Sequence, residues 1–246
     1  SVVEAKEPDE DSSFQAYPEY SHSDFQKIIF EKKEFNSNQL FLDSSATEDP
    51  CTSDFSIKPH QIVLKNFMNK ESPYRSLLVY HGVGVGKTCS GLTIAENFRD
   101  TYARNNRRIL ILCSKNIQIG WKKTIYSPEK GSNQCTGDSF TNTDAKTPRQ
   151  INKLTKQYYE IMAYQSFSNF VKRKQNEYVR KLPDDKKEQG KKEWFNEYFS
   201  GRLVIIDEAH NIRDDQGKEL RDAVQTIENM IKYSDELRLV LLTATP

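Results

Sequence analysis

The chain has 246 residues, of which 36% are hydrophobic and 29% are charged. This length suits one large α/β domain or two small ones, and the modest hydrophobic fraction predicts polar insertions around an ordinary core. No apolar run approaches the length of a membrane span, and the acidic, serine-rich start lacks the pattern of a signal peptide, so we expect an intracellular protein with no membrane partner.

The net charge of +1 conceals two parts of opposite charge. Residues 1–56 contain 4 Lys and Arg against 13 Asp and Glu, and residues 57–246 contain 32 against 22, which gives net charges of −9 and +10. A basic body suits a nucleic-acid partner, although an ordinary solvated surface explains the charge equally well. The acidic head is interpreted either as a tail that repels polyanions or as an interaction arm.

The predicted elements begin with an N-terminal extension over residues 1–56. Residues 1–22 are acidic and polar without an apolar period, which predicts disorder. Residues 24–42 contain enough Phe, Ile and Leu to pack against the rest of the chain as a helix and an ordered strap. Residues 43–56 read as a polar linker.

From residue 58 onward, short apolar runs alternate with helical patterns. The predicted strands are 76–81, 107–114, 159–164, 202–209 and 237–244. The predicted helices are 59–69, 87–103, 117–126, most of 165–200, and 214–232. Residues 127–150 are rich in Gly, Ser, Thr, Asn and Pro and are predicted to be an inserted loop. Buried strands alternating with helices predict the α/β class, with a mostly parallel sheet covered by helices on both faces.

The four cysteines are scattered along the chain at positions 51, 89, 113 and 135. They form no CxxC pair, and no histidine lies at zinc-binding spacing from two of them. We therefore expect Cys51, Cys89, Cys113 and Cys135 to be reduced thiols.

The stretch HGVGVGKT, residues 81–88, lies between the first predicted strand and the next helix. This is the setting of a P-loop, in which glycines let backbone N–H groups approach phosphate oxygens at a helix N-terminus. The strict pattern GxxxxGK[ST] requires glycine where the chain has His81, but the looser pattern xxxGxGKT is satisfied. A dinucleotide fingerprint GxGxxG is excluded because Lys87 takes the place of its third glycine.

The P-loop pattern predicts a site for ATP and Mg²⁺. Lys87 is expected to reach the β and γ phosphates, and the Thr88 hydroxyl is expected to bind Mg²⁺. The predicted nucleotide-binding residues of this loop are Gly82, Val83, Gly84, Val85, Gly86, Lys87 and Thr88.

Two adjacent acidic residues, Asp207 and Glu208, follow the apolar run LVII. Carboxylates at the carboxyl end of a parallel strand face the crevice in which ligands bind. Asp207 is predicted to hold Mg²⁺, and Glu208 is predicted to orient and deprotonate the attacking water.

The segment 171–199 mixes basic, acidic and aromatic residues. A DNA-binding stripe is one interpretation, but the interspersed Asp and Glu favour a solvated helical insert. We interpret Trp121 and Trp194 as core residues.

The motifs together resemble those of superfamily 2 helicases. DEAH at 207–210, GVGVGKT at 82–88 and TATP at 243–246 resemble motifs II, I and III, and KPHQ at 58–61 resembles the upstream glutamine motif. The run ILILCSKNIQIGW at 109–121 resembles motif Ia of Swi2/Snf2-like ATPases, with Ser114 where proline is common, and EIMAYQSF at 160–167 resembles the motif that follows. The string RLVIIDEAHNIRD is most similar to helicases of large cytoplasmic DNA viruses, including the group of the poxvirus early transcription factor small subunit and nucleoside triphosphatase I.

This resemblance implies that residues 57–246 form a RecA-like ATP-binding lobe, with insertions near 127–150 and 171–200. It implies that Gln61 contacts adenine and that His210, Thr243 and Thr245 couple the ATP site to the nucleic-acid track. Because the chain stops directly after a predicted core strand, we expect a fragment without the second RecA-like lobe, which supplies an arginine finger. Such a fragment is expected to bind Mg-ATP weakly and to hydrolyse it slowly or not at all.

The resemblance also implies an ATP-dependent motor that moves on nucleic acid, with DNA rather than RNA as the expected track. For a viral protein, it implies a role in transcription, a viral RNA polymerase as a candidate partner, and a location in the virion and host cytoplasm. Two alternatives stay open: a translocase that remodels complexes without unwinding, and a RecA-fold scaffold that docks RNA polymerase or virion proteins.

Overall fold

The computed structural model describes residues 17–37, 55–82, 84–212 and 217–245. The predictions made for residues 1–16, for most of the linker 43–56, for Cys51 and for Val83 lie outside the described residues. Among the described helices, none is long and apolar enough to cross a membrane.

The centre of the structure is a five-stranded sheet in the order β1-β5-β4-β2-β3. Its strands are β1 (Ser76–Tyr80), β2 (Ile109–Cys113), β3 (Tyr159–Ala163), β4 (Leu203–Asp207) and β5 (Arg238–Thr243). Every neighbouring pair is parallel. The predicted strands and the predicted α/β class are therefore confirmed, and all five carboxyl ends meet at one edge of the sheet.

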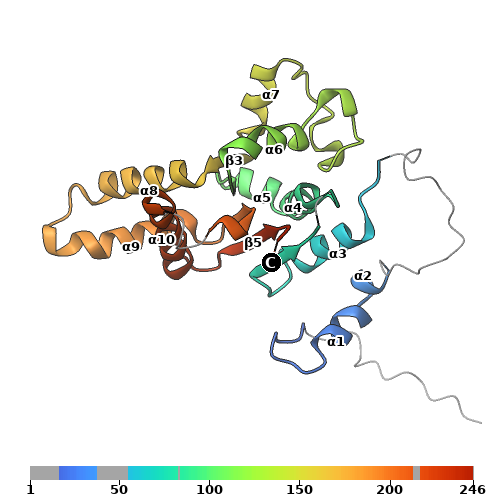
Figure 1. Ribbon diagram of the computed structural model, residues 1–246, viewed down its shortest axis with the longest axis horizontal. Coiled ribbons are helices and arrows are strands. Elements are labelled where there is room, and N and C mark those ends of the chain that lie inside the picture. Colours follow the sequence, from blue (N-terminus) through green and yellow to red (C-terminus); the bar gives the residue numbers. More distant parts are fainter. Residues whose placement is uncertain (1–16, 38–54, 83, 213–216, 246) are drawn as a thin grey trace, which may run out of the picture.

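Helices pack on both faces of this sheet (Figure 1). The bounds are α3 (Pro59–Phe67), α4 (Lys87–Glu96), α5 (Arg99–Arg104), α6 (Gln118–Ile125), α7 (Pro148–Thr155), α8 (Tyr164–Val179), α9 (Lys187–Phe199) and α10 (Gly217–Tyr233). The helix predicted over 87–103 is divided into α4 and α5 at Asn97 and Phe98. Phe98 is buried there, and the Asn97 side-chain amide donates to the carbonyl oxygens of Lys65 and Met68, so a tertiary contact fixes the break.

The two cores follow from the alternation of side chains along the strands. Ile111 of β2 belongs to the first core with α4 and α6, whereas Leu110 and Leu112 belong to the second core with α8, α9 and α10. Because β2 and β4 are buried at every position, their apolar runs show no polar alternation.

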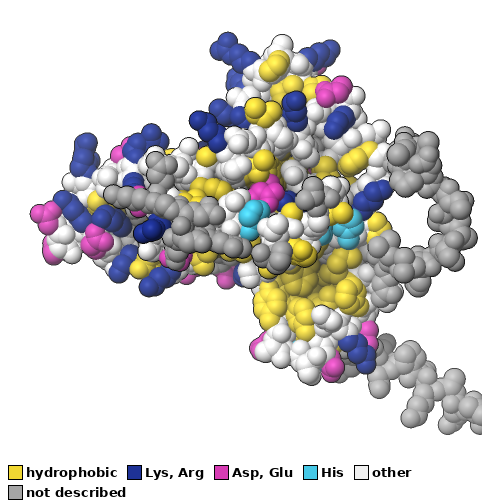
Figure 2. All heavy atoms as spheres, viewed as in Figure 1, with side chains coloured by type: hydrophobic (Ala, Val, Ile, Leu, Met, Phe, Trp, Pro, Cys, Tyr) yellow, Lys and Arg dark blue, Asp and Glu magenta, His cyan; other side chains and the backbone are white. Residues whose placement is uncertain are grey.

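Strand β1 departs from its predicted burial. Leu78 and Tyr80 are 62% and 58% exposed, whereas Val79 is 2% exposed. Leu78 and Tyr80 point to the face of the second core, whose buried residues come from β2, β4 and helices α8–α10. A hydrophobic patch over β1 is visible below the centre of Figure 2. The prediction of a buried strand is therefore wrong for one face of β1, because the second core, which covers this face on β2 and β4, includes no described residue of β1.

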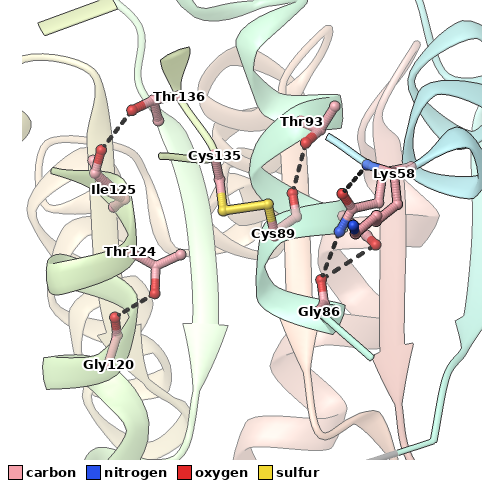
Figure 3. The surroundings of a disulfide bond; sticks show 11 residues. Lys58, Gly86, Cys89, Thr93, Gly120, Thr124, Ile125, Cys135 and Thr136 are labelled. Atoms are coloured by element: carbon pink, nitrogen blue, oxygen red, sulfur yellow. Dashed lines mark hydrogen bonds between the residues drawn. A yellow bond between two sulfur atoms is a disulfide. The ribbon is translucent and has the colours of Figure 1, made fainter. Parts of the chain in front are cut away.

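The segment 127–150 is more ordered than the predicted loop. It contains short 3₁₀ turns and the start of α7, and Phe140 is buried in the first core. A disulfide joins Cys135 of this segment to Cys89 of α4, with 5.3 Å between the two Cα atoms (Figure 3). The prediction of reduced thiols is wrong for this pair, because the segment folds back onto α4 and brings together cysteines 46 residues apart. Cys113 is free and buried.

The charged segment 171–199 forms most of a helical hairpin, α8 and α9, which extends to the left in Figure 1. Its apolar face contributes Trp194, Phe195 and Phe199 to the second core. Several of its charged side chains pair three residues apart on the solvated side, as in Lys187 with Asp184. The predictions of helical structure and of a core role for Trp194 are confirmed, and the status of the segment as an insertion stays a prediction.

The N-terminal extension packs against α3 through α1 (Phe25–Glu31) and α2 (Lys33–Asn36). The Tyr74 hydroxyl donates to the Pro18 carbonyl oxygen over 2.7 Å, and the Asn66 amide donates to the Glu34 carbonyl oxygen over 2.7 Å. The prediction that 24–42 contains a packed helix is confirmed for its described part.

Candidate nucleotide-binding and catalytic site

The loop between β1 and α4 has the backbone conformation that its glycines permit. Gly84 and Gly86 both have φ of +85°, in the left-handed region that side chains disfavour, and Gly86 caps the N-terminus of α4. Gly82 and Val85 are exposed. The loop is anchored at its start because the His81 backbone N–H donates to the Thr243 carbonyl oxygen over 3.1 Å.

Gln61 lies beneath this loop and is 3% exposed. Its side-chain oxygen accepts from the Lys58 backbone N–H, and its amide donates to the Gly86 carbonyl oxygen over 3.3 Å. A Cβ atom at Gly86 would approach the Gln61 amide nitrogen to 2.8 Å. Gln61 therefore joins the start of α3 to the loop between β1 and α4, and its contact with adenine stays a prediction.

The structure brings the P-loop lysine to the acidic pair after β4. The Lys87 ammonium is 2.6 Å from Glu208 Oε1 and 3.8 Å from Asp207 Oδ1. The Lys87 and Asp207 side chains are largely buried, at 12% and 4% exposure, which strengthens their interaction relative to a surface pair. Residues separated by 121 positions in the sequence thus form one charged centre.

Asp207 is held by three hydrogen bonds. Its Oδ2 accepts from the Trp121 indole N–H over 2.8 Å, and its Oδ1 accepts from the Glu208 backbone N–H over 2.9 Å. The Tyr164 hydroxyl donates to the Asp207 carbonyl oxygen. The prediction of a core role for Trp121 is incomplete, because the buried ring also donates to the site. Sequence reasoning missed this contact, and the position of Trp121 at the end of the run resembling motif Ia was the available signal.

The oxygen atoms at this edge of the sheet suit Mg²⁺. Mg²⁺ in nucleotide sites takes one or two protein oxygens and completes its shell with phosphate and water, so the two predicted ligands, Thr88 and Asp207, would be enough. Their binding of Mg²⁺ stays a prediction. No group of three or more His, Cys, Asp or Glu that could hold a metal occurs among the described residues. Burial raises the pKa of Asp207, and the Trp121 hydrogen bond and the Lys87 charge act against that rise.

Glu208 has a backbone conformation that non-glycine residues seldom adopt, with φ of 54° and ψ of 50°. This left-handed turn ends β4 and directs the chain into a short 3₁₀ helix over Ala209–Asn211. Asn106 and Glu236 share this conformation in other turns, so the role predicted for Glu208 stays a prediction.

The three residues predicted to couple the site to nucleic acid form one network with Glu208. His210 Nδ1 is 3.1 Å from Thr243 Oγ1 and 3.3 Å from Glu208 Oε2. The Thr243 hydroxyl donates to the Thr245 carbonyl oxygen over 2.6 Å and accepts from the Thr245 backbone N–H. Since Thr243 has only one proton to donate, it accepts from His210, which assigns the proton to His210 Nδ1.

Comparison with known proteins gives the family and its relatives. The model of the family described as "Type III restriction enzyme, res subunit" matches residues 54–246. The protein named "Putative ATP-dependent RNA helicase L377", from Acanthamoeba polyphaga mimivirus, is 31% identical over 266 residues, covering 94% of this chain and 22% of that protein.

Two further relatives agree with this result. "Putative ATP-dependent RNA helicase R563" of the same mimivirus is 27% identical, covering 80% of this chain and 30% of the relative. "Putative helicase 009L" of Frog virus 3 (isolate Goorha) is 24% identical, covering 76% of this chain and 18% of the relative. The chain thus spans less than a third of the length of these three relatives. With its parallel sheet, P-loop and acidic pair, the chain belongs to the type III restriction enzyme res subunit family, as a superfamily 2 helicase domain related to proteins of large DNA viruses.

Proposed function

We propose that this chain is the ATP-binding lobe of a nucleic-acid-dependent ATPase that couples ATP hydrolysis to movement along nucleic acid. The observation that carries the proposal is the 2.6 Å contact between Lys87 of the P-loop and Glu208 after β4. This contact supports the proposal, because phosphoryl transfer to water needs the proposed phosphate-binding cation, Lys87, and the proposed base, Glu208, close together.

Lys87 and the loop supply the binding of ATP. The loop's backbone N–H groups and the N-terminus of α4 stabilise phosphate charge, and Lys87 exchanges its ion pair with Glu208 for the β and γ phosphates. Thr88 and Asp207 would hold the Mg²⁺ that accompanies ATP, and this ion would neutralise charge on the phosphates.

Glu208 supplies the proton transfer. Once Lys87 has turned to the phosphates, the Glu208 carboxylate is available to orient a water molecule and accept its proton. The His210 side chain lies 3.3 Å from Glu208 Oε2 and is hydrogen-bonded to Thr243. A change at Glu208 on hydrolysis therefore alters the end of β5, which is the route we propose for coupling through His210, Thr243 and Thr245.

Complete catalysis is proposed to need a second RecA-like lobe, whose arginine would stabilise the transition-state charge. Residues 1–246 by themselves are then expected to bind Mg-ATP weakly and to hydrolyse it slowly or not at all. The acidic 1–56 extension and the inserts near 127–150 and 171–200 are proposed as additions to this lobe.

The nucleic-acid track, the biological role, the partner and the location of the protein are proposed from the resemblance to viral helicases and from the names of the relatives. We infer a DNA track, a role in viral transcription, a viral RNA polymerase as a partner, and a location in the virion and host cytoplasm. Two mimivirus relatives are named as RNA helicases, so RNA is the track to compare directly with DNA. The net charge of +10 over residues 57–246 supports a polyanionic partner.

The test is ATP hydrolysis by the full-length protein without nucleic acid, with DNA and with RNA. Glu208→Gln keeps the size of the side chain but removes its basicity, and hydrolysis is expected to fall by about two orders of magnitude or more while Mg-ATP still binds. The matched control is Glu193→Gln, the same change at an exposed residue of α9, which is expected to behave as the wild type.

The result also separates the classes of function. Nucleic-acid-stimulated hydrolysis that is lost in Glu208→Gln supports the motor. A wild-type protein that binds its partners normally but never hydrolyses ATP would overturn the motor in favour of a docking scaffold. Translocation without strand separation would identify a remodelling translocase.

A further inference from the structure

We propose that Trp121 is a positioning residue that fixes the carboxylate of Asp207 for Mg²⁺. The proposal rests on the function proposed above and assigns to the first core a second task besides stability. It is carried by the 2.8 Å hydrogen bond from the Trp121 indole N–H to Asp207 Oδ2.

The indole ring is itself immobilised. Trp121 is 1% exposed in the first core, and α6, which carries it, packs against α4 at a glycine. A Cβ atom at Gly91 would lie 3.1 Å from Trp121 Cη2 and 3.0 Å from a methyl group of Leu242, so only glycine lets the ring approach this closely. The donor is therefore held by its surroundings before any ligand arrives.

A different hydrogen-bond donor holds each of the two oxygens of the Asp207 carboxylate. Trp121 holds Oδ2, and the Glu208 backbone N–H holds Oδ1 over 2.9 Å. An ionised carboxylate has about four lone-pair directions, so each oxygen keeps one for a metal or its bound water. Rotation of the group about its Cβ–Cγ bond would break both hydrogen bonds, and the pair therefore defines the plane of the carboxylate.

The fixed plane of the Asp207 carboxylate matters because Mg²⁺ requires near-octahedral geometry and tolerates misplaced ligands poorly. Residues that orient a metal ligand commonly contribute an order of magnitude to metal affinity although they never touch the ion. The other buried tryptophan, Trp194, packs in the second core against Tyr198 and Phe199 and supplies a matched comparison.

The main experiment uses the whole chain and compares Trp121→Phe with Trp194→Phe. The readout is binding of a fluorescent ATP analogue as a function of Mg²⁺ concentration, and in EDTA. We expect Trp121→Phe to need about tenfold more Mg²⁺ for half-maximal binding, with unchanged binding in EDTA. Trp194→Phe is expected to keep the wild-type Mg²⁺ dependence. A Trp121→Phe protein with wild-type Mg²⁺ dependence would overturn the proposal.

A second measurement leaves both tryptophans in place, so it does not depend on the folding of Trp121→Phe. Indole N–H signals are recorded by NMR in the wild type and in Asp207→Asn. The Trp121 signal is expected to move upfield on loss of the charged acceptor, and the Trp194 signal is expected to stay. An unmoved Trp121 signal overturns the hydrogen bond. If the wild type shows no Mg²⁺-dependent nucleotide binding, the proposed function fails and this proposal fails with it. If the wild type binds and Trp121→Phe has the same Mg²⁺ dependence, this proposal alone is overturned.

Discussion

At the scale of single residues, His81 is the departure from the strict phosphate-binding pattern. Its ring meets that of His60 edge to face, with 5.2 Å between centroids, and its Nδ1 is buried without a hydrogen-bond partner in the described part of the chain. Burial, the neighbouring His60 and the Lys87 charge lower the pKa of His81. The folded protein therefore favours the neutral imidazole beside the P-loop.

This depressed pKa predicts a pH dependence of stability. The neutral His81 contributes to the free energy of unfolding. This contribution is fully present above the ordinary histidine pKa and is lost as pH falls through the lower pKa of the folded state, because the unfolded chain then binds more protons. Melting temperature is expected to fall between about pH 7 and pH 5, and less steeply in His81→Gln. The exposed His22 gives the control, since His22→Gln is expected to leave the slope unchanged. Equal slopes in all three proteins would contradict this origin.

At the scale of elements, the contact between α4 and α6 is the one that positions the site. It joins the helix that begins with the P-loop lysine to the helix that carries Trp121. Gly91 is buried at this contact. Gly120 of α6 is exposed, and a Cβ atom at this position would have no neighbour within 4 Å. Two helical glycines in adjoining elements thus have opposite surroundings.

The opposite surroundings predict opposite effects of alanine. In Gly120→Ala, the higher helix propensity is expected to stabilise the protein by up to about 1 kcal/mol. In Gly91→Ala the same gain in stability is opposed by close contacts with Trp121 and Leu242. Overpacking of this kind costs about 1–3 kcal/mol, so a net loss of stability is expected. Urea unfolding of both variants measures the difference, and stabilisation by Gly91→Ala would show that the α4–α6 contact is looser than described.

At the scale of the whole molecule, the Cys89–Cys135 disulfide ties the segment 127–150 to the helix that starts at the P-loop. Thr136, next to Cys135, also donates from its hydroxyl to the Ile125 carbonyl oxygen over 2.8 Å. The segment is thus attached both to α4 and to the end of α6. Its order follows from long-range contacts rather than from local propensity.

Closing a loop of 46 residues restricts the unfolded chain, and loss of the bond is expected to cost about 4 kcal/mol. Cys135→Ser, which leaves the P-loop helix unchanged, is expected to lower the melting temperature by about 10 °C under oxidising conditions. Reductant is expected to lower the melting temperature of the wild type to the same value and to leave that of Cys135→Ser unchanged. If reductant shifts both proteins equally, the stabilisation has another source.

Much of the fold and of the site was predictable because the relevant signals are local. The apolar runs at β2 and β4 are buried at every position and therefore read directly as strands. The P-loop and the acidic pair each follow a strand at its carboxyl end, and parallel strands bring such ends to one edge whatever the length of chain between them. The meeting of Lys87 with Glu208 follows from this rule.

Other features were not predictable, because they depend on which distant segments pack together. Leu78 is exposed because the second core, which covers the same face on β2 and β4, includes no described residue of β1, and the sequence of β1 does not reveal this. The pairing of Cys89 with Cys135 depends on the path of the segment between α6 and α7.

The sequence by itself determined the α/β class, the alternation of strands and helices, and the chemical groups of the proposed nucleotide site, because period, glycine placement and strand ends are local properties. The tertiary structure alone decided the strand order, the Cys89–Cys135 bond and the hydrogen bond from Trp121 to Asp207. These last three require surfaces far apart in the chain to fit one another, and such a fit is settled by packing of the whole molecule rather than by any short stretch.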